Sequence, residues 1–426
     1  MAERTLEVWC FDERAGVLID EPSGLAFTYA ESWRGAGRPP LSHSLPLAGS
    51  YTTAAVDAFF GGLLPEGTPR ELAARNLGVS VDNDFALLAA LGGDTAGAIS
   101  LLAPGERPAP VGRDVQWLEE SELATLIDEL PSRPMHADEE GEYRLSLAGA
   151  QNKLPVVLGT DRRIGLTKGR TPSTHILKTP IADHDGTIAN EALCPAIGRI
   201  LGIQTVHTSP RRVAGHEFLL VERYDREHTQ DGVRRLHQED FCQVLGIPAR
   251  RKYQNEGGPG LADGFALLRE AVAVPAREAL KLLDAVVLSF LIGNNDAHGK
   301  NYSLLYLPDS PKATLAPAYD LLSTVVYPGL SRKMAMSIGG EYRPDYVQPR
   351  HLNQLLEQAG LGPAAARRRI RALADAAPSA AHQARASLAE EGWAATVLTR
   401  IVETVEKRAS RMMEIAAPAP ARVRAG

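Results

Sequence analysis

The spacing of hydrophobic and polar residues divides the chain into stretches with a strand period and stretches with a helix period. Residues 4–30 alternate apolar and polar positions in short runs separated by Gly and Pro, which is typical of strands joined by turns. From Ala54 to Leu91 the spacing is helical, with Pro69 suited to a first helical turn and Gly78 to a helix end. The segment GAISLL returns to the strand pattern, so the N-terminal part should combine a small sheet with helices.

The middle of the chain predicts an antiparallel sheet that carries one helix, and the rest predicts helices. A Pro/Gly-rich loop spans 103–113, and a helix is predicted next at EESELATLIDEL. Strands are predicted at YRLSL, KLPVVL, THILK, QTVHT and EFLLVER, with a helix at ANEALCPAIGRILG. Beyond Gln238 the period is helical almost throughout, in QEDFCQVLG, ADGFALLREAV, REALKLLDAVVLSFLIG, HLNQLLEQAG, AAARRRIRALADAA and TRIVETVEKRASRMMEI.

These patterns predict an α+β protein of three units followed by a tail. We place an N-terminal unit with a small sheet and helices at 1–110 and a mostly antiparallel β-rich lobe at 111–237. An all-helical lobe should follow at 238–414. Residues 415–426 are rich in Pro and Ala, which predicts a disordered tail.

Composition narrows the class of protein. With 426 residues, 44% of them hydrophobic, the chain can bury a large core, and its formal net charge of -6 leaves room only for a local nucleic-acid patch. Cys10, Cys194 and Cys242 lie far apart in apolar runs, so we expect buried free thiols and neither a disulfide nor a zinc site. No targeting segment and no apolar run of about 18 residues, the length of a membrane span, is found. The cytoplasm is therefore the expected location.

A polar cluster, NNDAHGKN, stands between a long apolar helix and an apolar strand. Asp296 and Asn301 within it are five residues apart, the interval between base and metal ligand in the protein-kinase catalytic loop. In phosphoryl transfer a carboxylate accepts the proton of the attacking hydroxyl, while an amide oxygen holds Mg²⁺ on the phosphates. Asp and Asn also stabilise turns, and the spacing taken alone favours that more ordinary role.

A second carboxylate and a strand lysine could complete such a site. Asp320 in LAPAYDLLST follows a short apolar strand, where it could bind Mg²⁺ or, alternatively, cap a helix that begins at Leu321. Lys178 ends the strand THILK in the manner of a phosphate-contacting lysine, and Glu191 on the next helix could pair with it. Strand-end lysines also often stay solvated, so this signal alone is weak.

Two further segments fall where a nucleotide site would need them. SLAGAQNK, residues 146–153, has small residues that would let backbone N–H groups approach phosphate oxygens, although an ordinary turn fits it nearly as well. FLLVERYDR lies where a hinge would offer backbone groups to adenine, and a buried strand that ends in charges is the alternative. Loop, strand lysine, helix glutamate, hinge, helical lobe, Asp/Asn pair and second Asp follow one another as in protein kinases. This order predicts a protein-kinase-like two-lobed fold.

These ordered segments resemble the HipA-like kinase toxins of bacterial type II toxin–antitoxin systems. Similar segments cover most of the chain: FFGGLLPEGTPRELAARN, GGDTAGAISLL, SLAGAQNKLPVVL, THILKTP, NEALCPAIGRILG, LLVERYDR, LHQEDFCQVLG, IGNNDAHGKN and APAYDLLST. The resemblance implies a serine/threonine kinase that uses ATP and Mg²⁺. It makes Asp296 the catalytic base, Asn301 and Asp320 the metal ligands, and Lys178 the phosphate-contacting lysine.

The same resemblance implies the remaining nucleotide contacts and a regulatory serine. The implied ATP-binding residues are Ala148, Gly149, Ala150, Gln151, Asn152, Lys153, Lys178, Glu222, Arg223, Tyr224, His298, Lys300, Asn301, Tyr319, Asp320 and Leu321. Ser146 matches the serine that such enzymes autophosphorylate, which is implied to eject the phosphate loop and stop activity; an ordinary strand hydroxyl is the alternative. The chain lacks D-F-G, A-P-E and G-x-G-x-x-G, so control through an activation loop should be absent or different.

Partners are implied as well. Family members are implied to phosphorylate aminoacyl-tRNA synthetases, glutamyl-tRNA synthetase in the best-known type, and thereby to arrest growth. A HipB-like helix-turn-helix antitoxin is the implied partner that brings the kinase to operator DNA. Arg367, Arg368, Arg369 and Arg371 could touch DNA phosphates, although a solvated helix face is the more ordinary role.

Two rival functions stay open at this point. A catalytically silent HipA fold could serve only as antitoxin partner and DNA co-repressor, but it would have no chemical need for Lys178, Asp296, Asn301 and Asp320 together. A metal-dependent hydrolase built on Asp296, His298 and Asp320 would need a closer group of ligands, and the sequence has no HExxH.

Overall fold

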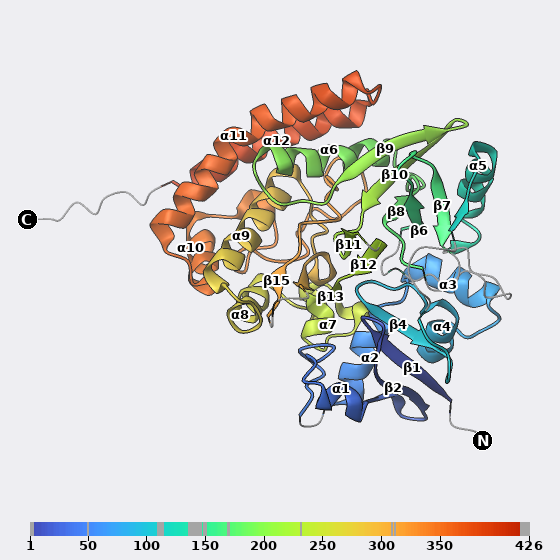
Figure 1. Ribbon diagram of the computed structural model, residues 1–426. Coiled ribbons are helices and arrows are strands. Elements are labelled where there is room, and N and C mark those ends of the chain that lie inside the picture. Colours follow the sequence, from blue (N-terminus) through green and yellow to red (C-terminus); the bar gives the residue numbers. More distant parts are fainter. Residues whose placement is uncertain are drawn as a thin grey trace, which may run out of the picture.

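A computed structural model of the chain shows an N-terminal part, a β-rich part and a helical part (Figure 1). It describes residues 4–48, 51–108, 115–134, 147, 151–167, 171–230, 232–307, 310 and 312–417. The predicted α+β class is confirmed, because antiparallel sheets precede a long helical region. The strand predicted at YRLSL falls outside these residues, except for Leu147.

The N-terminal part is a four-stranded sheet packed against helices, as predicted. Its strands are arranged in the order β3-β2-β1-β4, with all pairs antiparallel. They are β1 (Thr5–Cys10), β2 (Glu13–Glu21), β3 (Gly24–Tyr29) and β4 (Ile99–Leu102), and the helices are α1 (Glu31–Gly35), α2 (Thr53–Gly61), α3 (Gly67–Asn76) and α4 (Asp84–Leu91). Gly78 adopts φ +63° just beyond α3, which confirms its predicted place at a helix end.

The β-rich part is a six-stranded antiparallel sheet between two helices. The order is β5-β7-β6-β8-β10-β9, with β5 (Val115–Trp117), β6 (Lys153–Leu158), β7 (Ile164–Thr167), β8 (His175–Lys178), β9 (Thr208–Val213) and β10 (His216–Glu222). Phe218 and Leu220 of β10 pack in one cluster with α5 (Glu120–Glu129), while Leu219 and Val221 pack in another with α6 (Thr187–Ile200). Alternate residues of one strand therefore serve the two faces of the sheet.

One strand of this sheet was predicted at the wrong place. The segment QTVHT is not a strand; β9 begins only at Thr208 and contains Pro210 and two arginines. Pro210 is tolerated because β9 is an edge strand, where a missing N–H breaks no ladder on its outer side.

The helical part was predicted to contain helices only, but it also contains strands. It contains α7 (Phe241–Val244), α8 (Leu261–Ala271), α9 (Pro275–Ile292), α10 (Pro349–Ala359), α11 (Pro363–Glu390) and α12 (Thr396–Ile415). A three-stranded sheet of β13 (His237–Asp240), β14 (Ser303–Tyr306) and β15 (Thr314–Leu315) lies among them, so the helix predicted at QEDFCQVLG is half strand. A hairpin of β11 (Arg226–Thr229) and β12 (Gly232–Arg235) precedes it. Helix α12 includes Ile415, and the rest of the predicted tail from residue 418 lies outside the described residues.

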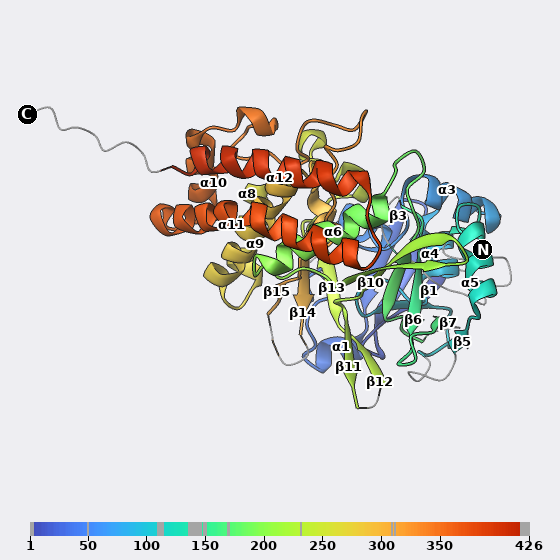
Figure 2. The same ribbon diagram turned by 90° about the horizontal axis from the view of Figure 1, so that it is seen from above.

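The hydrophobic cores do not follow chain order strictly. Helix α6 precedes the predicted boundary at 237, yet its buried side chains belong to the core of the helical part. In the view from above, α6 lies beside α11 and α12, with which it is in contact (Figure 2). The three cysteines are buried and free, as expected. In the described part of the chain, no helix combines the length and hydrophobicity needed to cross a membrane.

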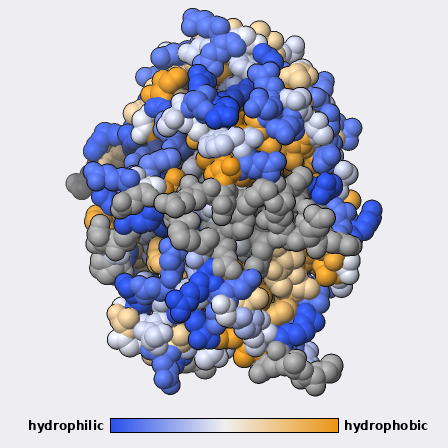
Figure 3. Space-filling model, turned by 45° about the vertical axis from the view of Figure 1, so that its right-hand side comes forward, coloured by the Kyte–Doolittle hydropathy of each residue, from blue (hydrophilic) through white to orange (hydrophobic). Residues whose placement is uncertain are grey.

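The surface visible in Figure 3 is mixed in character. Hydrophilic residues dominate the described part of this face, and apolar residues form separate patches among them. The exposed large hydrophobic side chains, such as Ile200 and Leu280, come from different elements.

A buried ionic network joins the N-terminal part to the end of the β-rich sheet. The carboxylate of Asp94 is fully buried and lies 2.8 Å from Arg226, 3.1 Å from Arg235 and 3.4 Å from Arg223. Asp225 adds a second carboxylate, 2.8 Å from Arg223. Burial alone would raise the pKa of Asp94, but the three guanidinium groups outweigh it and hold that pKa well below its usual range.

A second buried contact joins the N-terminal part to β13. The carboxylate of Glu239 is fully buried, and it accepts hydrogen bonds from the Ser42 hydroxyl at 2.5 Å, from the Tyr306 hydroxyl and from the backbone N–H of His43 at 3.4 Å. Burial raises the pKa of Glu239 from 4.5 to about 7. The N-terminal part is therefore docked through polar groups that water does not reach.

Removing the negative charge of Asp94 should destabilise the whole chain. In Asp94→Asn three buried guanidinium groups lose their shared counter-charge, so we expect the free energy of unfolding to fall by about 3–5 kcal/mol, measured from the midpoint of urea unfolding. The control Asp161→Asn removes an exposed ion pair with Arg163 and should leave the midpoint unchanged. Equal midpoints for wild type and Asp94→Asn would contradict the role given to the network.

Glu239 should make stability depend on pH. A raised folded-state pKa means that the stabilising contribution is fully present below pH 4.5 and is lost as the pH rises to about 7. The loss amounts to about 3 kcal/mol, which urea unfolding at a series of pH values would measure. Glu239→Gln is neutral at every pH and should not show this loss, whereas Glu71→Gln, at an exposed position of α3, should behave like wild type. The prediction fails if Glu239→Gln keeps the wild-type slope.

Candidate active site

The segment NNDAHGKN forms a tight connection between α9 and β14. Helix α9 ends at Ile292 because Gly293 adopts φ +76°, a left-handed conformation that stops the helix. The side chain of Asn294 then braces the connection, since its Oδ1 accepts from the Asp296 N–H at 3.0 Å and its Nδ2 donates to the Asp320 carbonyl at 3.4 Å. A short 3₁₀ turn at Gly299–Asn301 leads into β14. Residues 294–301 thus form one braced turn, which is called the catalytic turn below after its predicted role.

Four predicted site residues from distant parts of the sequence meet in one cluster. The Asp320 carboxylate accepts from Lys178 Nζ at 2.7 Å on Oδ1 and from Asn301 Nδ2 at 3.0 Å on Oδ2. Lys178 also forms a buried ion pair with Glu191 of α6. Strand β8, helix α6, the catalytic turn and the segment after β15 each contribute one member.

The backbone of Asp320 argues against its alternative role as a helix cap. Asp320 adopts φ +55°, a left-handed conformation that is uncommon outside glycine, and the described residues that follow it form no helix at Leu321. Such strained positions are often found at functional sites, where surrounding contacts hold them. Here the contacts are those with Lys178, Asn301 and Asn294.

Charge inside the cluster is balanced around the lysine. Burial alone would lower the pKa of Lys178, but the carboxylates of Asp320 and Glu191 outweigh it and raise that pKa above its ordinary value. The Lys178 ammonium in turn holds the pKa of Asp320 well below its usual range, so the Asp320 carboxylate is ionised near neutrality. The Asp320 side chain nevertheless keeps 43% exposure, which leaves it accessible to a ligand.

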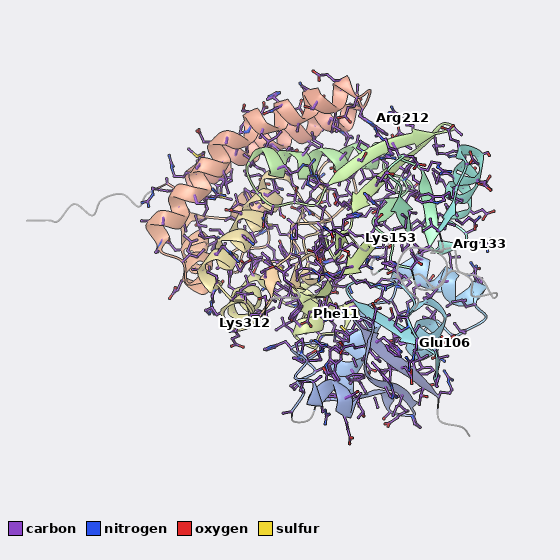
Figure 4. The ribbon with its side chains drawn as sticks, in the orientation of Figure 1. Phe11, Glu106, Arg133, Lys153, Arg212 and Lys312 are labelled. Atoms are coloured by element: carbon purple, nitrogen blue, oxygen red, sulfur yellow. The ribbon has the colours of Figure 1, made fainter. Side chains whose placement is uncertain are left out.

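Lys153 adds a second ammonium beside the first. Lys153 of β6 and Lys178 of β8 are direct partners across the two strands, so their side chains share one face of the sheet. Burial, and next the positive charge of Lys178, lower the pKa of Lys153 to about 8. Figure 4 shows Lys153 toward the middle of the molecule, while Arg133, Arg212 and Lys312 lie at its periphery. Two lysines on one face would suit an anionic ligand.

The predicted base lies at the edge of this cluster and faces solvent. Asp296 is exposed, and its Oδ1 accepts a hydrogen bond from the Tyr253 hydroxyl at 3.0 Å. Partial enclosure of the carboxyl group, and to a lesser extent the negative charge of Asp320, raise the pKa of Asp296. His298, two residues on, is buried; burial lowers its pKa to about 4, so the imidazole is neutral.

Several predicted nucleotide contacts have other partners. The guanidinium of Arg223 is buried in the Asp94 network, and the N–H groups of Arg223 and Glu222 donate to Thr174 and His207. Lys300 Nζ points to the N-terminal part, where it donates to the Gly62 carbonyl at 3.0 Å. These side-chain and backbone N–H groups are therefore hydrogen-bonded to other parts of the protein.

The remaining predicted contacts surround the cluster or lie outside the described residues. The ring of Tyr224 stacks on that of Tyr319 at 5.4 Å, and the Tyr319 hydroxyl donates to the Lys300 carbonyl at 2.6 Å. Leu321 is buried in the core of the helical part. Gln151 and Asn152 bond to the backbone of Thr179 next to Lys178. Ser146, Ala148, Gly149 and Ala150 lie outside the residues that the structure describes.

The oxygen donors present fit a magnesium ion. Asn301 Oδ1 accepts the N–H of His298 at 3.1 Å and keeps a second lone pair, while Asp320 offers an ionised and accessible carboxylate. Mg²⁺ commonly takes one or two protein carboxylates and fills its shell with phosphate oxygens and water. In the described residues no group of three or more His, Cys, Asp or Glu side chains could hold a metal alone.

The arginine cluster on α11 is mostly occupied within the protein. Arg369 forms an ion pair with Asp284 at 2.8 Å, and Arg367 and Arg371 donate to backbone carbonyls at the end of α12. Arg368 and Arg369 are exposed, as predicted for a solvated face, while Arg367 and Arg371 are half-buried and bonded to the end of α12.

Sequence reasoning missed Tyr253, Asn294 and Glu66. Tyr253 contacts the base across 43 positions of sequence, and Glu66 contacts Lys252 across 186, so no local pattern reports either contact. Asn294 had a usable signal, because it is the first of two adjacent asparagines directly after the glycine that ends α9.

The chain is similar to known proteins over most of its length. The model of the HipA-like C-terminal domain matches residues 145–381, and that of the HipA N-terminal domain matches residues 6–102. The chain is 45% identical over 388 residues to "Putative kinase Y4mE" of Sinorhizobium fredii, covering 89% of this chain and 91% of that protein. It is 30% identical over 371 residues to "Serine/threonine-protein kinase toxin HipA" of Shewanella oneidensis, covering 84% of each.

A solved structure agrees over nearly the whole chain. The Shewanella oneidensis toxin–antitoxin complex of HipA, HipB and operator DNA contains a chain that matches with a TM-score of 0.83 and 26% identity. The match covers 97% of this chain and 100% of that one. The chain therefore belongs to the HipA family.

Proposed function

We propose that the chain is a serine/threonine kinase toxin that transfers the γ-phosphate of ATP, with Mg²⁺, to a protein hydroxyl in the cytoplasm. The observation that carries the proposal is the cluster in which Lys178 joins Glu191 to Asp320, and Asp320 joins Asn301. A lysine, its glutamate partner, an aspartate and an asparagine are the groups that phosphoryl transfer requires around the phosphates and their metal.

Each residue then has a role that follows from its position. Lys178 and Lys153 hold phosphate oxygens, and Glu191 keeps the Lys178 ammonium in place. Asp320 and Asn301 would hold Mg²⁺, which when bound neutralises charge on the phosphates. Asp296 accepts the proton of the attacking hydroxyl; its exposed position lets a hydroxyl of another protein reach it. The neutral imidazole of His298 supports the turn and adds no charge next to the base.

The wider function rests on the relatives. The Shewanella relative is named a kinase toxin and was solved with HipB and operator DNA. We therefore propose a HipB-like antitoxin as partner, operator DNA bound through it, and an aminoacyl-tRNA synthetase, glutamyl-tRNA synthetase first, as substrate. Autophosphorylation of Ser146 as an off-switch belongs to the same proposal. The units 1–110, 111–237 and 238–414 remain the proposed division of the chain.

The silent binding module is the second candidate, and the site geometry disfavours it. A protein that only binds an antitoxin gains nothing from a strained Asp320 or from Lys153, whose ammonium is disfavoured by enclosure and by the adjacent Lys178. Such costs are usually kept where chemistry needs them.

Loss of the base should abolish transfer without affecting the fold. Asp296→Asn keeps the size of the side chain but accepts no proton, so label from γ-³²P-ATP incorporated into bacterial extract proteins should fall by about 10²-fold or more. The thermal midpoint should match wild type, and the exposed control Asp345→Asn should keep full activity. Equal labelling by wild type and Asp296→Asn would refute the proposed base.

Asp320 should link Mg²⁺ to nucleotide binding. Titration calorimetry of ATP into wild type should show tighter binding with Mg²⁺ than without it, because Asp320 and Asn301 would hold the ion and the ion would neutralise charge on the phosphates. In Asp320→Asn the metal site would lose its charged ligand, and we expect the effect of Mg²⁺ to shrink by at least about tenfold. A variant that keeps the full Mg²⁺ effect would show that the metal is held elsewhere.

A further inference from the structure

A segment outside the nucleotide cluster lies directly against the catalytic turn. The carbonyl of Lys252 accepts the N–H of Gly299 at 3.2 Å. On the other side Gln254 donates its N–H to Ala335 at 3.3 Å, and its side chain accepts the N–H of Ser337 at 2.7 Å. Residues 252–254 are therefore fixed on both sides, with the side chain of Tyr253 directed at the catalytic turn.

Tyr253 contacts the catalytic turn twice. Its hydroxyl donates to Asp296 Oδ1 at 3.0 Å, and its ring meets the imidazole of His298 edge-on, with centroids 5.2 Å apart and planes at 83°. The neighbouring Lys252 ammonium lies 5.6 Å from the Tyr253 ring centroid and 3.0 Å from Glu66 of the N-terminal part. The ring thus has a defined position before any substrate arrives.

This arrangement leaves the two oxygens of Asp296 in different states. Oδ1 is held by the Tyr253 hydroxyl, whereas Oδ2 has no hydrogen-bond partner within the ranges that the structure describes. Without a partner on Oδ1, an exposed aspartate would rotate freely about its terminal bond, which has only broad minima. Fixing one oxygen therefore sets the direction of the other.

We infer that Tyr253 is a positioning residue for phosphoryl transfer: its hydroxyl fixes Oδ1 of Asp296 so that Oδ2 accepts the proton of the substrate hydroxyl. The inference rests on the proposed function. In the step, that proton passes to Oδ2, the hydroxyl oxygen bonds to the γ-phosphorus, and the bond from phosphorus to the β-γ bridging oxygen breaks, releasing ADP. Tyr253 keeps its own proton throughout, since enclosure of the phenol, and next the negative charge of Asp296, raise its pKa above the ordinary value.

The test is Tyr253→Phe, which keeps the ring and removes only the hydroxyl. Label incorporation from γ-³²P-ATP into bacterial extract proteins is followed as ATP is varied at fixed extract concentration. We expect the maximal rate to fall about tenfold to hundredfold, the range for losing a hydrogen bond to a charged group, with an unchanged apparent KM for ATP. Tyr346→Phe is the matched control; Tyr346 is 57% exposed beside Arg343, and its variant should be fully active.

Each other outcome overturns the inference. An unchanged maximal rate in Tyr253→Phe, with active wild type, means that the hydroxyl does not orient the base. A raised maximal rate means that it competes with the substrate hydroxyl and acts as a gate. A fall in rate accompanied by a higher KM for ATP or a lower thermal midpoint points to a structural role. If wild type labels no protein at all, the proposed function fails first, and this inference fails with it.

Discussion

The site depends on the ammonium group of Lys178, which joins strand β8 to helix α6 and to the segment after β15. Without this group the carboxylates of Glu191 and Asp320 would lack their counter-charge. Glu191 is buried on α6, and Asp320 is held in a left-handed conformation after β15; Lys178 at the end of β8 contacts both. Lys178 and Glu191 are both buried, so removing either one would leave the other charge without its partner, at a cost greater than the pair contributes. Because Asp320 also bonds Asn301, the position of the catalytic turn follows from the same lysine.

The N-terminal part supports this arrangement from two sides. Its Asp94 forms ion pairs with the arginines that follow β10. Beside the catalytic turn, its Gly62 contacts Lys300 and its Glu66 contacts Lys252. The Asp94 contacts are ionic and buried, whereas Lys300 donates to a backbone carbonyl and the pair of Lys252 with Glu66 is half-buried. The candidate site is therefore in contact with the N-terminal part as well as with the β-rich and helical parts.

Much of the site could be predicted because its residues lie in short segments with a recognisable residue type and spacing. A cluster was predicted from the spacing of Asp296 and Asn301 and from the positions of Lys178, Glu191 and Asp320 along the chain. The structure joins four of these residues by direct contacts: Lys178, Glu191, Asn301 and Asp320. Residue type did not predict where a side chain points. Lys300 and Arg223 lie in the predicted segments, but their charged groups contact the N-terminal part.

What the sequence could not supply came from tertiary contact. The strand β9 escaped prediction because an edge position lets it contain Pro210, a fact visible only once the sheet order is known. The left-handed Asp320 has no sequence signature, since it is imposed by partners far away along the chain. The contact of Tyr253 with Asp296 is of the same kind, and it indicates how a carboxylate on a solvent-exposed turn can still be held in one orientation.

A protein kinase moves the γ-phosphoryl group itself to protein. Parallel labelling of a bacterial extract with γ-³²P-ATP and with α-³²P-ATP in the presence of the purified chain distinguishes this transfer from other uses of ATP. We expect protein-bound label from the γ position and none from the α position. Label from the α position, or no label from either, would rule out the proposed kinase.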